Sequence, residues 1–355
     1  MIKDIDRYTS HINIEEIGIE GQKKIKKGSV VIIGIGALGS VALQYLTAAG
    51  VGFIGIVDGD IIELSNLTRQ TIYSEMDVGM SKVAVSKNRM MALNNDVKIT
   101  PYNTYIDPKN GYDIIKNYDI IIDGTDNSKS KNLINKLSVS LRKPLIFASV
   151  NNFNAMISTF WHGHGPCYHC IFGEKNQDYK GCDEGVLAPS ASIAGSLQAL
   201  EAIKIITGSN NLLIGKLLLF NGTNYHMNII SIRKNPACNV CSKSGNNNIS
   251  KIDYGNYFIT CKMLSEWKKI DSNNIIIYDV RDKYSYSMSH IENAINVSAE
   301  EVMSGNAMVD RSKNVIIYCH NGMKSGFIAY LLREKGYSNV YSLENGFKEW
   351  KKSEL

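Results

Sequence analysis

The stretch that most constrains the fold is VVIIGIGALGS, at residues 30–40. A run of β-branched residues leads into Gly34-x-Gly36-x-x-Gly39, and a helical stretch follows it. This order predicts a strand, a tight turn and a helix, with the backbone N–H groups of the turn and the helix N-terminus facing a phosphate. The glycines therefore predict a nucleotide site, although the turn alone suits ATP and a dinucleotide such as NAD equally well.

Further apolar runs predict the fold class. VGFIGIVDGD (51–60), YDIIIDGTDN (118–127) and PLIFASV (144–150) read as buried strands, and polar helical segments lie between them. Strands that alternate with helices predict a mostly parallel sheet, so we expect an α/β, Rossmann-like domain.

The chain is long enough for two domains, because 355 residues exceed one ordinary hydrophobic core. The polar stretch SKSGNNNISK reads as a linker, and the strand-and-turn pattern resumes after it. We expect a first domain at residues 1–243, a linker at 244–256 and a smaller α/β domain at 257–355.

Composition narrows the class of protein. The net charge of +5 comes without dense Lys/Arg tracts, which argues against nucleic-acid binding. The N-terminal MIKDIDRYTS has no apolar signal segment, and glycines interrupt the uncharged run at 30–57, so we predict no membrane span. Seven cysteines, including two CxxC pairs, favour metal ligands and reactive thiols over disulfides. We expect a cytoplasmic protein.

Polar and charged residues that follow the glycine turn in the sequence distinguish an ATP site from an NAD site. Asp58 follows the second strand, where a ribose-binding carboxylate is expected. Asn66 and Arg69 lie in GDIIELSNLTRQ, and Lys82 follows. Such cations suit the charge that develops on pyrophosphate, and Asp126 in DGTDN is a predicted Mg²⁺ ligand. The set favours an adenylating site.

Two cysteine pairs have metal-ligand spacing. Cys167 and Cys170 form one CxxC pair, and Cys238 and Cys241 form the other. Two pairs at this spacing suit one tetrahedral zinc ion. An iron–sulfur cluster and buried free thiols remain alternatives on spacing alone.

Two further cysteines are candidate nucleophiles. Cys182 lies in the Gly-rich DYKGCDEGVLAPS, a predicted crossover loop, although the adjacent Asp183 and Glu184 disfavour its thiolate. Cys319 ends a predicted strand in IIYCHNGMKSG. Loop N–H groups, a following helix and Lys324 would stabilise a thiolate or persulfide there.

The motifs GIGALGS, VDGDIIELSNLTRQ, DGTDN and GSLQALEAIK, with the two CxxC pairs, together resemble the ThiF/MoeB-type E1 enzymes from about residue 6 to residue 241. The resemblance implies adenylylation of the C-terminal glycine of a small ubiquitin-like sulfur carrier, with ATP and Mg²⁺, in a homodimer. It places Asp58 on the ribose, Arg69 and Lys82 on the phosphates, and Asp126 on magnesium. It also implies structural zinc on the four paired cysteines and a catalytic crossover-loop cysteine at Cys182.

The motifs YDVR, SHIENAINV and CHNGMKSG resemble a rhodanese domain over about residues 257–350. This implies a persulfide on Cys319, supplied by an upstream donor such as a cysteine desulfurase, and a carrier that leaves as a thiocarboxylate. The family pattern is not complete, because Ser10 stands where the family has an arginine that reaches the other subunit's phosphate. We expect His11 or a lysine to substitute, or a lower nucleotide affinity.

Three rival hypotheses stay open at the level of sequence. The chain could be an NAD-dependent oxidoreductase, an E1-like scaffold without activity, or an E1-like enzyme that forms a thioester on Cys182 for protein conjugation. The rhodanese-like segment favours sulfur delivery over conjugation.

Overall fold

The computed structural model describes residues 2–173, 185–242, 257–304, 312–320 and 322–353. The chain divides into two compact units, one mainly before residue 246 and one mainly after it. The predicted linker at 244–256 lies outside the described residues, and the exact domain boundaries stay a prediction.

The first unit is built on one sheet. Its strands are β1 (Ser29–Ile33), β2 (Phe53–Val57), β3 (Lys98–Tyr102), β4 (Ile120–Asp123), β5 (Leu145–Asn151), β6 (Asn154–Phe160), β7 (Lys216–Asn221) and β8 (His226–Ser231). They lie in the order β3-β2-β1-β4-β5-β6-β7-β8. The pairs from β3 to β5 are parallel and those from β5 to β8 are antiparallel. The α/β prediction is confirmed, and the antiparallel extension is an addition to it.

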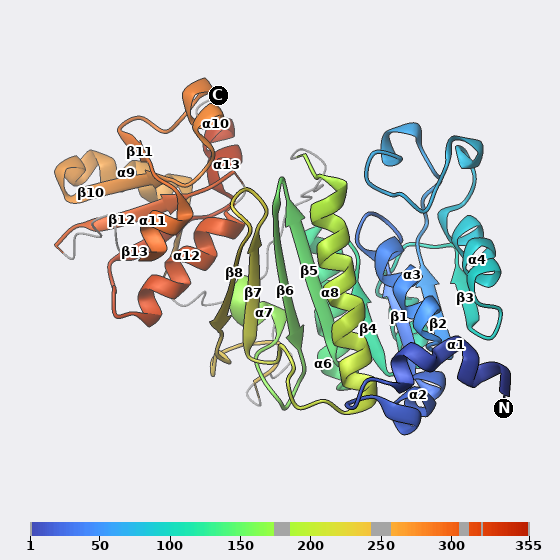
Figure 1. Cartoon of the computed structure of the whole chain (residues 1–355). Coiled ribbons are helices and arrows are strands. Elements are labelled where there is room, and N and C mark those ends of the chain that lie inside the picture. Colours follow the sequence, from blue (N-terminus) through green and yellow to red (C-terminus); the bar gives the residue numbers. More distant parts are fainter. Residues whose placement is uncertain (1, 174–184, 243–256, 305–311, 321, 354–355) are drawn as a thin grey trace. The chain divides into compact units, whose positions relative to one another are not determined.

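Helices cover this sheet, and Figure 1 shows α8 lying across it. α3 packs against α8 and β1, whereas α6 packs against β4 and β5. Pro189 occupies the first turn of α8, where its missing N–H costs nothing. The helices are α1 (Ile2–Ile12), α2 (Gly18–Lys27), α3 (Gly39–Ala49), α4 (Lys82–Leu93), α5 (Gly111–Ile115), α6 (Ser128–Leu141), α7 (Tyr168–Phe172) and α8 (Ala188–Thr207), with 3-10 turns η1 (Leu64–Asn66) and η2 (Glu75–Asp77).

The sheet positions a site at the ends of two strands. β1 pairs with β2 on one side and with β4 on the other, so the order of the strands reverses between β1 and β4. In open α/β sheets, ligands bind beyond the carboxyl ends of the strands at such a switch point. The loops after β1 and β4 therefore define the place where a nucleotide is expected.

The second unit is built on a smaller parallel sheet with helices, which agrees with the predicted α/β class. Its strands are β9 (Phe258–Ile259), β10 (Ile275–Asp279), β11 (Ala294–Asn296), β12 (Asn314–Tyr318) and β13 (Val340–Leu343), in the order β11-β10-β12-β13-β9. Every pair is parallel. The accompanying helices are α9 (Cys261–Asp271), α10 (Lys283–Met288), α11 (Ala299–Ser304), α12 (Met323–Glu334) and α13 (Gly346–Ser353), with the turn η4 (Ser272–Asn274). Among the described residues of both units, no helix has the length and apolar character needed to cross a membrane.

Candidate functional site

The glycine turn is in backbone contact with the loop that follows β4. Gly34 has a φ of +89°, and a Cβ there would lie 2.8 Å from the carbonyl oxygen of Gly124. A Cβ on Gly39 would lie 1.9 Å from the carbonyl oxygen of Gly34. Both positions therefore require glycine. A Cβ on Gly36 would meet only the Gln70 amide nitrogen, at 3.7 Å, so this position stays open on the side that a ligand can approach.

Asp58 lies directly behind the glycine turn. Its carboxylate accepts the N–H of Ile35 at 2.7 Å and the N–H of Asp60 at 2.8 Å, and the residue is 8% exposed. Burial raises the pKa of the Asp58 carboxyl above its ordinary value. The carboxylate thus positions the turn and still has lone pairs that can accept hydroxyl groups.

Lys82 begins α4 with its ammonium group held by an acid. Its Nζ lies 2.9 Å from Oδ2 of Asp60, and the Tyr105 hydroxyl donates to the other oxygen of that carboxylate. Burial opposes ionisation of Asp60, but these two hydrogen bonds outweigh it and lower the pKa of Asp60. The same bond, with burial, raises the pKa of Tyr105 to about 12. Asp60 ends the motif VDGD next to Asp58, but sequence reasoning gave it no role, and it did not single out Tyr105.

The segment after β2 carries the next predicted residues. Asn66 is 7% exposed, and its side-chain oxygen accepts the N–H of Glu63 at 3.2 Å. The Arg69 guanidinium donates to the carbonyl oxygen of Ser65 at 3.1 Å. Gln70, which sequence reasoning missed, is buried with its amide against Gly36, and its Oε1 has no hydrogen-bond partner in the described part of the chain.

Asp126 is exposed in the loop after β4, two residues beyond Gly124. Asn127 caps α6 by accepting the N–H of Ser130 at 2.8 Å. Beneath the loop, Asp123 and Lys131 form a buried ion pair of 2.9 Å. The structure thus brings the loop that carries Asp126 to the glycine turn, because a Cβ on Gly34 would lie 2.8 Å from the carbonyl oxygen of Gly124.

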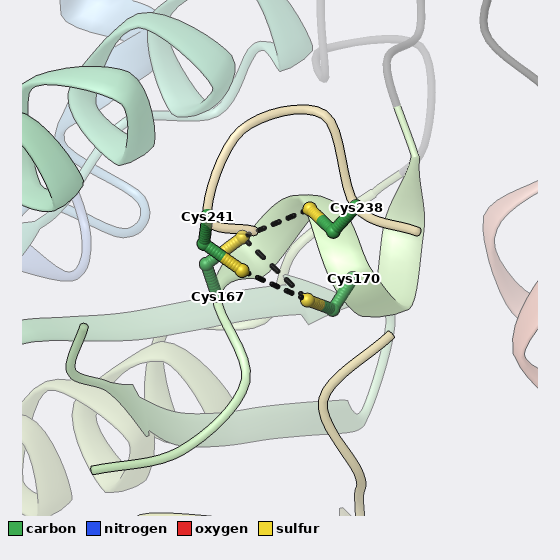
Figure 2. A group of neighbouring side chains, drawn as sticks. All are labelled: Cys167, Cys170, Cys238 and Cys241. Carbon is green, nitrogen blue, oxygen red and sulfur yellow. Dashed lines mark hydrogen bonds between the residues drawn. The ribbon is translucent and has the colours of Figure 1, made fainter. Parts of the chain in front are cut away.

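The four paired cysteines form one buried cluster, which Figure 2 shows. Their sulfur atoms lie within 4.8 Å of one another, with contacts of 3.8, 3.7 and 3.4 Å. A tetrahedral zinc ion with Zn–S bonds of about 2.3 Å places its sulfurs about 3.8 Å apart, so the donor set fits zinc. Asn135 of α6 holds the first pair, because its amide lies 3.8 Å from Sγ of Cys167 and its oxygen accepts the N–H of Tyr168. The cluster comprises Cys167, Cys170, Cys238 and Cys241.

Two expectations concern residues away from this cluster. Cys182 lies outside the described residues. Ser10 is exposed on α1, and the ring of the neighbouring His11 lies 3.0 Å from Oε1 of Gln22 on α2.

In the second unit, Cys319 follows β12 and is 5% exposed. Its carbonyl oxygen accepts the N–H of Phe347 at 2.8 Å, so the start of α13 holds the loop. Gly322 caps α12 with a φ of +78°. The Ser325 hydroxyl lies 3.5 Å from the Cys319 sulfur, whereas the exposed Lys324 directs its Nζ to the carbonyl oxygen of Val280 at 3.5 Å.

In comparisons with known proteins, each of the two units matches a known family. Residues 8–240 match the model of the ThiF family, and residues 265–353 match that of the rhodanese-like domain. The chain is 32% identical to the Mycobacterium tuberculosis protein named probable adenylyltransferase/sulfurtransferase MoeZ, over 99% of this chain and 93% of that protein. It is 31% identical to the Zea mays adenylyltransferase and sulfurtransferase MOCS3-1, over 98% of this chain and 81% of that protein. Among solved structures, E. coli MccB with ATP matches with a TM-score of 0.59 and 27% identity, covering 68% of this chain and 75% of that one.

Proposed function

The chain belongs to the ThiF family and carries a rhodanese-like domain behind it, and from this we propose that it is an adenylyltransferase and sulfurtransferase acting on a small ubiquitin-like sulfur carrier. In the first reaction, the terminal glycine carboxylate of the carrier attacks the α-phosphate of ATP. An acyl-adenylate forms, and pyrophosphate leaves with the electrons of the broken P–O bond.

One observation carries the nucleotide assignment: the glycine turn touches the loop after β4, with Asp58 behind the turn. Gly34 and Gly39 shape the turn, with the N–H of Gly34 bonded to the carbonyl oxygen of Val57, and the open side of the turn at Gly36 and the N-terminus of α3 face the phosphates. Asp58 accepts the ribose hydroxyls.

The segment between β2 and α4 supplies the polar contacts to the phosphates. Arg69 and Lys82 neutralise the charge that develops on pyrophosphate, and Asn66 contributes amide contacts. Lys82 exchanges its contact with Asp60 for a phosphate oxygen. These roles rest on the contact of Lys82 with Asp60, on the position of Asn66 and Arg69 just before Gln70, whose amide lies against Gly36, and on the likeness to MccB with ATP.

Asp126 suits magnesium. Its carboxylate oxygens are hard ligands, and its loop lies at the carboxyl end of β4 beside the turn. A bound Mg²⁺ ion would neutralise phosphate charge there. The buried ion pair between Asp123 and Lys131 fixes the base of the loop that carries Asp126.

We assign the four-cysteine cluster to one structural zinc ion. All four sulfurs are buried and come from this chain, so no position is left open for a substrate. The ion joins two segments that are far apart in the sequence, which gives it a role in stability rather than in chemistry.

Sulfur transfer follows in the second reaction. A donor such as a cysteine desulfurase leaves a persulfide on Cys319. Its terminal sulfur attacks the acyl carbon, a C–S bond forms, the C–O bond to the phosphate breaks, and AMP leaves with the bonding pair. A thiolate then attacks the Cys319 sulfur of the acyl disulfide, so the thiocarboxylate departs and a new disulfide remains on Cys319 until a second thiol reduces it. Cys182 or an external thiol can act as the attacking thiolate.

The assembly and location follow from the same proposal. We propose a homodimer in which His11 or a lysine takes the place of the family arginine, because both subunits carry Ser10 at that position. Because persulfide chemistry needs reduced thiols, we place the protein in the cytoplasm. A thioester on Cys182 is the second candidate, but the rhodanese-like domain supplies a sulfur that conjugation does not need.

The decisive experiment follows the carrier by mass spectrometry. The full chain is incubated with Mg²⁺-ATP, a persulfide donor and a ubiquitin-like carrier that ends in Gly-Gly. The wild type should replace one terminal oxygen by sulfur, whereas Cys319→Ser should stop at the acyl-adenylate, because a serine hydroxyl cannot carry the persulfide. Thiocarboxylate formed by Cys319→Ser at the wild-type rate would contradict the proposal and direct attention to Cys182.

A further inference from the structure

Two buried serines connect Cys319 to a strand that is distant from it in sequence. Ser325 lies in the first turn of α12 and Ser342 lies on β13, and both are 0% exposed. The Ser342 hydroxyl lies 2.9 Å from the Ser325 hydroxyl, which in turn lies 3.5 Å from the Cys319 sulfur. The three groups form a continuous hydrogen-bonded chain that ends at the sulfur.

The position of Ser342 is unusual for a serine. β13 lies between β12 and β9, where Ser342 is paired with Ile317 on one side and with Phe258 on the other. Interior strands of parallel sheets are mostly built from Val, Ile and Leu. A hydroxyl buried there costs free energy unless it forms a hydrogen bond, and its partner is Ser325.

The backbone of α12 is shaped for this contact. The residue after Ser325 is Gly326, and a Cβ at that position would lie 2.7 Å from the ring of Phe258 and 3.8 Å from the Ser342 hydroxyl. The glycine therefore lets α12 approach β9 and β13 closely, which brings Ser325 within reach of Ser342.

The direction of donation gives the chain its chemical meaning. Ser342 donates to the oxygen of Ser325, so the proton of Ser325 is directed to the sulfur. A donor aimed at sulfur stabilises an anion, whether thiolate or persulfide. We propose that Ser342 is a positioning residue for the reacting sulfur of Cys319, acting through Ser325, an inference that rests on the proposed function of Cys319.

Ser342 fixes the orientation of the Ser325 hydroxyl group. Without it, the Ser325 hydroxyl can turn its proton away from the sulfur, and the sulfur anion loses part of its stabilisation. Substitution of Ser342 leaves every charged group around the loop in place, so differences between variants report the hydroxyl alone. Those groups are Lys324 on α12, Asp279 at the end of β10, Arg281 after that strand, His320 beside the cysteine, Glu344 after β13 and Lys348 on α13.

The test measures how fast iodoacetamide alkylates Cys319 in the full chain, by mass spectrometry of the Cys319 peptide. At pH 6, we expect Ser342→Ala to react about threefold more slowly, because fewer of its thiols are ionised. At pH 10, it should react as fast as the wild type or faster, because a thiolate that lacks the hydrogen bond is the stronger nucleophile. Ser325→Ala should show the same crossover, with a loss of about tenfold at pH 6.

Three controls make the result specific. Ser342→Thr should react within about twofold of the wild type, because it keeps a hydroxyl, whereas the similarly shaped Ser342→Val should match Ser342→Ala. This pair, both β-branched on a strand, also serves if the alanine variant fails to fold. The double variant Ser325→Ala/Ser342→Ala should equal Ser325→Ala alone. Ser287→Ala, which removes a hydroxyl bonded within α10, should not change the rate.

Three outcomes overturn the inference: a wild-type rate for Ser342→Ala at both pH values, an equal slowing at both, or a Ser342 effect that persists in the Ser325→Ala background. None of these measurements uses the carrier. If Cys319→Ser still forms thiocarboxylate while Ser342→Ala shows the crossover, the proposed function fails and the positioning role of Ser342 stands.

Discussion

Two turns in this chain follow the same local plan and differ in what they expose. β1 leads through a glycine turn into α3, and β12 leads through the Cys319 loop into α12. In the first turn, Gly34 and Gly39 are required by backbone contacts and Gly36 stays open. In the second, a cysteine takes the strand end, and two buried hydroxyls extend behind it.

The difference shows how one architecture supports two chemistries. A glycine-rich turn presents backbone donors to a ligand that brings its own negative charge. A turn that begins with cysteine holds the negative charge on the protein and needs donors behind the sulfur to stabilise it. The residue at the strand end therefore decides whether the turn binds the anion of a ligand or carries a negatively charged sulfur of its own.

The largest effect that we expect comes from loss of zinc, which concerns the first unit and not the second. Only the first unit has a four-cysteine cluster among the described residues. We expect Cys238→Ser to lose zinc and to lower the midpoint of thermal unfolding of the first unit by on the order of 10 °C, because zinc binding is coupled to folding. Metal analysis and calorimetry check this, with Cys261→Ser as the control outside the cluster. Iron in the purified protein, or an unchanged midpoint, would contradict the assignment.

The next effect separates the two reactions. We expect Asp126→Ala to reduce carrier-dependent ATP–pyrophosphate exchange by on the order of 10²–10³, because a ligand of the magnesium ion that would neutralise the reacting phosphates is lost. Cys319→Ser should leave that exchange unchanged, since it acts after the acyl-adenylate forms. The isotope-exchange assay compares both variants in parallel. Full exchange by Asp126→Ala would remove Asp126 from the magnesium site.

The smallest effect compares a glycine in each turn. We expect Gly36→Ala to change the free energy of unfolding by less than about 0.5 kcal/mol, because its Cβ meets only the Gln70 amide, and yet to weaken ATP binding. Gly322→Ala should lower stability by roughly 1–2 kcal/mol, because its φ of +78° is left-handed, and it should leave ATP binding unchanged. Chemical denaturation and nucleotide titration measure the two quantities. Unchanged ATP binding by Gly36→Ala would show that the open side of Gly36 is not a ligand surface.

Local patterns predicted the parts of the molecule that depend on residue identity and short spacing. The glycine turn, the strands around it and the grouping of four cysteines follow from such patterns, because backbone geometry and metal ligation demand particular residue types. The roles of Asp58, Arg69, Lys82 and Asp126 stay predictions that the experiments above test.

Sequence patterns did not reveal where each strand lies in its sheet, or which residues that are distant in the sequence contact one another. Strand β3 contains Pro101, which argues against a strand but is tolerated at the edge of a sheet. The buried Asp123–Lys131 pair looks like surface charge in the sequence. Ser342 looks like a polar interruption in an apolar run, and its meaning depends on Ser325 of another element.

The cysteine cluster has a further consequence for chain connectivity. One pair precedes residues 171–237 and the other follows them, so a bound metal ion closes that segment into a ring containing α8, β7 and β8. After one cleavage within this ring, the metal ion still joins the two parts of the chain. A protease that cleaves once within the segment leaves two fragments joined through the ion, and they separate only when a chelator is added under denaturing conditions.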